Sequence, residues 1–169
     1  VLQAGCAGEE ASASRAGEPE RGATVEATAA AGPKVVFLGD SLTAGLHLPA
    51  DQAYPAVLER ELAAHGAPFE LVNAGISGDT TAGGLARLDW LLEQDPDWHV
   101  VALGANDGLR GLPVTSIDDN LRAICERALA TGTSVSLLGM RLPPNYGVDY
   151  SEAFARVFDS IAEDLELPY

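Results

Sequence analysis

Basic side chains are scarce in this 169-residue sequence, which has 10 lysines and arginines against 25 aspartates and glutamates and a formal net charge of −15. This deficit argues against binding to nucleic acid or to an anionic membrane surface, because both require basic patches. No apolar run approaches the ~18 residues that suggest a membrane-spanning helix. The two cysteines, Cys6 and Cys125, make no disulfide framework, and Cys125 is expected to be a buried thiol.

Apolar residues make up 47% of the sequence, as in a globular protein, but they are unevenly distributed. Residues 7–32 contain no aromatic side chain and are expected to form a flexible linker. The preceding "VLQAGC" resembles the end of a bacterial lipoprotein signal peptide, with Cys6 as the residue to be lipidated. We therefore divide the chain into a residual signal-peptide end (1–6), a linker (7–32) and a folded domain (33–169). The protein is expected to be extracytoplasmic, either periplasmic or lipid-anchored at the cell envelope.

Four short apolar runs alternate with amphipathic segments in the folded domain. The runs are expected to be strands over residues 34–39, 69–75, 98–104 and 134–139. The intervening segments are expected to be helices, over residues 84–94 and from Ser116 and Ser151 among others. Strand starts recur about every 30 to 35 residues, the size of a βαβ unit. This pattern predicts a three-layer α/β/α sandwich around a parallel, flavodoxin-like sheet, with four strands present and the fifth largely missing.

Chemically useful residues follow the first three predicted strands, at the edge where open α/β sheets bind ligands. They are Ser41 in "GDS", Gly78 in "ISGD" and Asn106 in "GAND". The set fits acyl transfer, with Ser41 as the nucleophile. The backbone N–H groups of Ser41 and Gly78 and the side-chain amide of Asn106 would form an oxyanion hole. We expect a small acyl ester or thioester as substrate, and neither a cofactor nor a metal ion.

The same residues carry a family resemblance. Gly39-Asp40-Ser41-Leu42, then Gly78, then Gly104-Ala105-Asn106-Asp107 resemble the first three sequence blocks of the SGNH (GDSL) hydrolase superfamily. "FLGDSLTAG", "NAGISGDTTAGG", "LGANDGLRG" and "MRLPPNYG" are similar, in this order, to its bacterial thioesterase, lysophospholipase and arylesterase branch. The resemblance implies a serine hydrolase acting through an acyl-enzyme, with Asp40 and Asp107 holding the loops by hydrogen bonds.

One block of the superfamily is missing, the D-x-x-H that supplies the catalytic Asp and His. His65 and His99 are expected at the opposite end of the sheet. His47 lies six residues after Ser41 and is a candidate for contact with substrate, but as a base it would need a hydrogen bond to Ser41. We therefore expect the catalytic Asp and His to lie beyond residue 169, and the fragment to be inactive.

Other residues lie near the predicted site. Pro144 and Tyr146 lie after the fourth strand and are expected to line the acyl pocket, unless their segment is only a rigid loop. Asp79 is expected to cap the following helix. Trp90 is expected to be at least partly buried. Two other functions are considered: a flavodoxin-like phosphate or flavin binder with "GDSLTAG" as the phosphate loop, and a non-catalytic surface-anchored binding lipoprotein.

Overall fold

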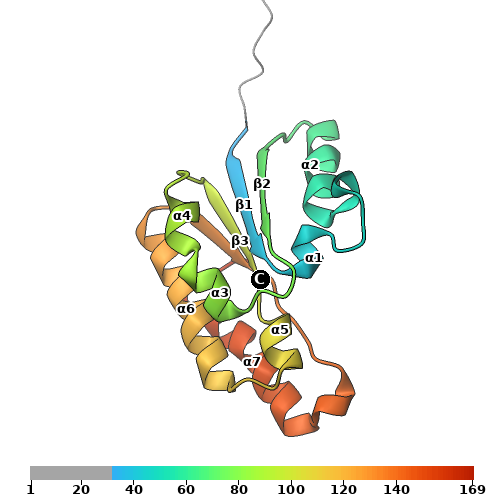
Figure 1. Cartoon of the computed structure of the whole chain (residues 1–169). Helices are drawn as coiled ribbons and strands as arrows, with labels where there is room; N and C mark the ends of the chain where they lie inside the picture. Colours follow the sequence, from blue (N-terminus) through green and yellow to red (C-terminus); the bar gives the residue numbers. More distant parts are fainter. Residues whose placement is uncertain (1–31) are drawn as a thin grey trace, which may run out of the picture.

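The computed structural model describes residues 32–169 (Figure 1). The predictions for Cys6, for the signal-peptide end and for nearly all of the linker lie outside the described residues. No helix in the described part of the chain is long and apolar enough to cross a membrane.

Four parallel strands form one sheet. They are β1 (Lys34–Gly39), β2 (Glu70–Gly75), β3 (Trp98–Ala102) and β4 (Ser134–Leu137), in the order β2-β1-β3-β4. Gly39 pairs in register with Gly75 on one side and with Ala102 on the other, so the first three strands end together. This confirms the predicted parallel, flavodoxin-like sheet and brings the three loops that follow these strands to one edge.

Helices cover both faces of the sheet. Figure 1 shows α2 (Tyr54–Ala64) on one side and α3 (Thr81–Ala86), α4 (Leu88–Leu92) and α6 (Val114–Ala130) on the other. The last long helix, α7 (Val148–Asp164), packs against α6. The short helices α1 (Ser41–Ala44) and α5 (Ala105–Leu109) follow β1 and β3, and two 3-10 turns span Ala50–Gln52 and Pro144–Tyr146.

Strand alternation divides the core between the two faces. Val36 and Leu38 belong to the larger core, which α4, α6 and α7 complete with a set of leucine, isoleucine and phenylalanine side chains. Phe37 points to the other face, where its ring lies 5.8 Å from that of Tyr54 at the start of α2. Cys125 is buried in the larger core, as expected, and burial raises the pKa of its thiol to about 12.

Three local predictions are wrong. The helix expected over 84–94 is two helices broken at Arg87, and Leu88 and Leu91 of the second helix are buried. Trp90 is 62% exposed on the second of them. The helices expected from Ser116 and Ser151 begin two and three residues earlier, at Val114 and Val148. Helix propensity alone does not locate these boundaries, because tertiary contacts decide them.

The described sheet ends at β4, as predicted. Residues 167–169 form no strand, but the Leu137 N–H donates to the Pro168 carbonyl at 3.2 Å. Tyr169 lies against Gly139, where an added Cβ would come within 2.5 Å of the Tyr169 hydroxyl. The end of the described chain therefore runs beside the β4 edge.

Candidate active site

Ser41 is the first residue of α1, directly after β1. The Asp40 carboxylate caps this helix by accepting a hydrogen bond from the Leu42 N–H at 2.9 Å. A Cβ at Gly39 would lie 1.9 Å from Thr43 Oγ1, so glycine is needed for α1 to pack against the end of β1. The turn therefore presents Ser41, which is partly exposed, at the carboxyl edge of the sheet.

Asp40 itself is only 1% exposed. Burial is the main cause that raises the pKa of its carboxyl, and the nearby charges of Asp79 and Asp107 act in the same direction, whereas hydrogen bonds from the backbone oppose the shift. The carboxylate has the N–H of Leu42 and the amide of Asn106 as donors. Asp40 thus sits inside the turn as a holding group rather than facing the open edge.

Gly78 lies in a tight turn between β2 and α3. The Asp79 N–H closes this turn on the Ile76 carbonyl at 3.0 Å, and Gly78 has a φ of +83°. An L side chain rarely adopts that angle, whereas nothing but the end of Arg110 lies within 4 Å of an added Cβ. The glycine is therefore required by its backbone conformation.

Asn106, in the first turn of α5, joins the other two loops. Its amide nitrogen donates to the Asp79 carbonyl at 2.9 Å and to Asp40 Oδ2 at 3.3 Å. One partner follows Gly78 and the other precedes Ser41 in sequence. The structure therefore brings together the loops of the three residues predicted as nucleophile and oxyanion donors.

Asp107, the next residue, is buried, and each of its carboxylate oxygens accepts one hydrogen bond. It accepts hydrogen bonds from the Thr81 N–H at 2.9 Å and from Thr81 Oγ1 at 2.6 Å. The Thr81 hydroxyl accepts in turn from the amide of Asn120 on α6 at 3.0 Å. This network ties α5 to α3 and α6, and so fixes the helix that carries Asn106.

We expect Thr81→Val to lower the free energy of unfolding by about 1–3 kcal/mol, because valine keeps the shape but leaves Asp107 and Asn120 each short of a buried partner. Urea denaturation followed by circular dichroism measures this change. Thr115→Val, at an exposed position on α6, is the matched control and should stay within about 0.5 kcal/mol. Equal unfolding free energies for Thr81→Val and the parent protein would contradict the role assigned to the network.

The prediction that Asp79 caps α3 is wrong. Thr80 is the cap, and its hydroxyl accepts from the Gly83 N–H at 3.2 Å. Asp79 instead forms an ion pair with Arg87 at 2.9 Å. The sequence carried no signal for this pair, because Arg87 reads as an ordinary polar position of a helix.

The three histidines lie in different surroundings. His47 is exposed, with a φ of +68°. His65 caps the far end of α2, where its Nδ1 lies 2.7 Å from the Glu61 carbonyl. His99 is completely buried at the start of β3, and neither ring nitrogen has a hydrogen-bond partner among residues 32–169. None of the three forms a hydrogen bond with Ser41 within the described part of the chain.

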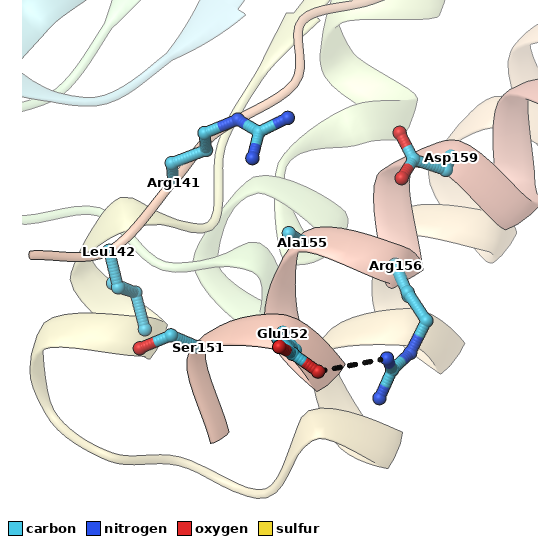
Figure 2. Close-up of a pocket in the computed structure, with 7 residues that line it drawn as sticks. All are labelled: Arg141, Leu142, Ser151, Glu152, Ala155, Arg156 and Asp159. Atoms are coloured by element: carbon cyan, nitrogen blue, oxygen red, sulfur yellow. Dashed lines mark ion pairs between the residues drawn. The ribbon is translucent and has the colours of Figure 1, made fainter. Parts of the chain in front are cut away.

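The segment after β4 contacts the end of α5, the helix that carries Asn106. Tyr146, in the 3-10 turn that begins at Pro144, donates its hydroxyl proton to the Leu109 carbonyl at 3.2 Å. A hollow of about 300 Å³ opens between this segment and α7, lined by Arg141, Leu142 and residues of α7 (Figure 2). It contains none of Ser41, Gly78 and Asn106, and neither Pro144 nor Tyr146 lines it. No cluster of His, Cys, Asp and Glu suited to a metal ion occurs within the described residues.

A parallel α/β sandwich with a glycine-flanked serine at the end of its first strand, met there by a glycine loop and an asparagine, defines a class of serine hydrolases. The sequence model of the GDSL-like lipase/acylhydrolase family matches residues 37–169. The chain belongs to this family of ester-bond hydrolases, as the sequence blocks predicted. The alternative of a phosphate or flavin binder is thereby set aside.

Relatives and solved structures agree with this assignment. The chain is 48% identical over 134 residues to Esterase TesA of Pseudomonas aeruginosa, covering 79% of this chain and 67% of the relative. It is 42% identical over 141 residues to thioesterase 1/protease 1/lysophospholipase L1 of Escherichia coli K12, covering 83% of this chain and 66% of the relative. The solved structure of AlinE4, an SGNH-hydrolase family esterase, superposes with a TM-score of 0.78 at 38% identity, covering 81% and 74% of the two chains. The chain thus spans about two thirds of the length of these curated relatives.

Proposed function

We propose that Ser41 attacks the carbonyl carbon of an acyl ester or thioester and forms an acyl-enzyme. The observation that carries this proposal is the hydrogen bonding of Asn106 to both neighbouring loops, which gathers three separate chain segments around one point. There the N–H groups of Ser41 and Gly78 stabilise the oxyanion that forms as the carbonyl is attacked. The amide of Asn106 joins them by exchanging its longer hydrogen bond, 3.3 Å to Asp40 Oδ2, for one to the oxyanion. The Ser41 Oγ–C bond forms, the bond to the alcohol or thiol breaks, and water later releases the acid.

Apolar side chains beside the site support a substrate that carries an acyl group. Leu42, next to Ser41, is 65% exposed, and Ile76, in the Gly78 turn, is 51% exposed. Leu109, at the end of α5, is also exposed, and Tyr146 hydrogen-bonds to its carbonyl. Exposed apolar groups around a polar centre suit a substrate with a hydrocarbon part and a polar ester. The relatives' names, esterase and thioesterase/lysophospholipase, fit the same class.

Activation of Ser41 requires a base within hydrogen-bond reach. His99 is locked in the core and His65 lies at the other end of α2, so neither serves. His47 remains a candidate for contact with substrate, as do Pro144 and Tyr146. Activity is therefore to be measured on the full-length product of the gene that encodes this chain.

We propose an extracytoplasmic location, from the resemblance of residues 1–6 to a lipoprotein signal-peptide end and the composition of residues 7–32. Lipidation of Cys6 would anchor such a protein to a membrane. Mass spectrometry of the mature N-terminus, in a bacterial host that processes lipoproteins, distinguishes a lipidated cysteine from a free one.

Covalent labelling tests the nucleophile directly. We expect diethyl p-nitrophenyl phosphate to phosphorylate Ser41 of the full-length protein: the Oγ–P bond forms, p-nitrophenolate leaves, and the serine proton passes to the base. Peptide mass spectrometry should place one adduct on the peptide that contains Ser41, with one equivalent of p-nitrophenolate released. Ser41→Ala should remain unlabelled. An adduct on another serine, or labelling that persists in Ser41→Ala, would refute the assignment.

A further inference from the structure

The loop that carries Gly78 is held in place by partners outside it. The Gly78 carbonyl accepts from Arg110 Nη2 at 2.8 Å, and the Asp79 carbonyl accepts from Asn106 at 2.9 Å. The Ile76 N–H donates to the Gly39 carbonyl, at the end of β1, at 3.0 Å. The Gly78 loop is therefore held by β1, by α5 and by Arg110 at the end of α5, not by its own turn alone.

Arg87 connects this loop to the turn of the nucleophile. Its Nε and Nη2 each lie 2.9 Å from Asp79 Oδ2, and its Nη2 donates to the Gly39 carbonyl at 3.1 Å. Asp79 directly follows Gly78, and Gly39 lies two residues before Ser41. One guanidinium group thus bridges the two loops that carry the nucleophile and an oxyanion donor.

The surroundings are shaped to admit this bridge. The side chains of Arg87 and Asp79 are 19% and 12% exposed, so the pair is largely shielded from water. A Cβ at Gly83 would lie 1.8 Å from Asp79 Oδ1, so only glycine leaves room for the carboxylate. Arg87 itself stands at the break between α3 and α4, with a non-helical backbone.

The positive charge of Arg87 has a second effect, on the electrostatics of the site. The pKa of Asp40 is raised mainly by burial, and Asp79 is the first of the charges that raise it further, so the field of Asp79 reaches the nucleophile turn. An unpaired Asp79 carboxylate would also repel the negative charge that develops on the substrate's carbonyl oxygen. Arg87 balances that carboxylate at a distance of 2.9 Å.

We propose that Arg87 is a positioning residue of the hydrolase site, which holds the Gly78 loop against the Ser41 turn and neutralises Asp79 beside the oxyanion hole. This inference rests on the proposed function. The proposal gives the helix break at Arg87 a role in the site.

The test uses the full-length protein with p-nitrophenyl butyrate as substrate. We expect Arg87→Ala to lower kcat by about 10- to 100-fold with KM changed by less than about threefold, because the oxyanion donors act on the transition state. Arg87→Lys keeps the positive charge, but an ammonium group cannot donate to Asp79 and to the Gly39 carbonyl with the geometry of a guanidinium. Its kcat should therefore lie between those of the parent protein and Arg87→Ala. Added methylguanidinium should raise kcat of Arg87→Ala and not that of the parent protein. Arg127→Ala, which removes an exposed ion pair with Asp89, is the matched control and should leave kcat unchanged.

Several outcomes decide the matter. Titration with diethyl p-nitrophenyl phosphate counts the molecules whose Ser41 can react. A variant that is only unstable would show fewer reactive molecules, each with the kcat of the parent protein. That result would overturn the proposal. Equal kcat for Arg87→Ala and the parent protein, or a loss that appears only in KM, also overturns it. If the parent protein and Ser41→Ala hydrolyse the ester equally, the proposed function fails and this inference fails with it. A kcat loss with a full complement of sites and rescue by methylguanidinium supports it.

Discussion

Replacing Ser41 by alanine is expected to lower kcat for p-nitrophenyl butyrate by about 10⁶-fold in the full-length protein, as in other serine hydrolases that lose the nucleophile. Alanine leaves the Asp40 cap and the packing of α1 in place, because neither involves the Ser41 hydroxyl. The oxyanion donors also remain, so a residual rate of about 10³ to 10⁴ over water is expected. Release of p-nitrophenolate followed at 400 nm measures the change.

The control for this experiment is Ser116→Ala. Ser116 is exposed on α6 and forms no part of the site, so its loss should leave kcat unchanged. The melting temperatures of both variants should match that of the parent protein. A Ser41→Ala variant that hydrolyses the ester as fast as the parent would show that Ser41 is not the nucleophile.

Acidification is expected to destabilise the protein through His99, and His99→Leu is expected to remove that part of the effect. Burial lowers the pKa of His99 from its ordinary 6.5 to about 4. Between these values the unfolded chain binds a proton on this residue and the folded chain does not. The stability that the neutral His99 provides is therefore intact above pH 6.5 and is lost progressively as the pH falls toward 4, by about 2–3 kcal/mol at pH 4.5.

Urea unfolding of the parent protein and of His99→Leu at pH 7.5 and pH 4.5 measures this contribution. Carboxylates titrate in both proteins, so the difference between them isolates the histidine. Cys125 shares the core but, with a pKa of about 12, stays neutral throughout. Leucine also removes two buried nitrogens that lack partners, so the variant should be no less stable at pH 7.5.

His65→Gln is the control, because His65 is exposed at the end of α2. Its stability should follow the parent protein at both pH values. If the parent protein and His99→Leu lost the same stability on acidification, His99 would not be the buried neutral group described here.

The strands and the three site loops followed from the sequence because their signals are local. Each strand is an apolar run bounded by small residues, and the observed bounds of β1 match the predicted 34–39. Ser41, Gly78 and Asn106 follow consecutive strands of a parallel sheet, so topology alone brings their loops to one edge. The hydrogen bonds from Asn106 to Asp40 and Asp79 hold the three loops together at that edge.

The contacts that hold these loops could not be read from the sequence. Arg87 has partners 8 and 48 residues away, and arginine is common within helices, so neither the break nor the bridge was visible. Thr81 likewise looks like a surface residue until the fold buries it against Asp107, with Asn120 as its second partner. The error on Trp90 has the same origin, because the break at Arg87 turns the second helix and presents the indole to solvent.

The strand order has a consequence for how the molecule withstands partial unfolding. Ser41, Gly78 and Asn106 follow β1, β2 and β3, and both β2 and β3 pair with the central β1, whereas the edge strand β4 precedes none of the three residues. Local unfolding of β4 can therefore expose its amide protons to exchange while the Ser41, Gly78 and Asn106 loops stay together. Loss of the pairing between the two inner strands, β1 and β3, would instead separate the Ser41 loop from the Asn106 loop.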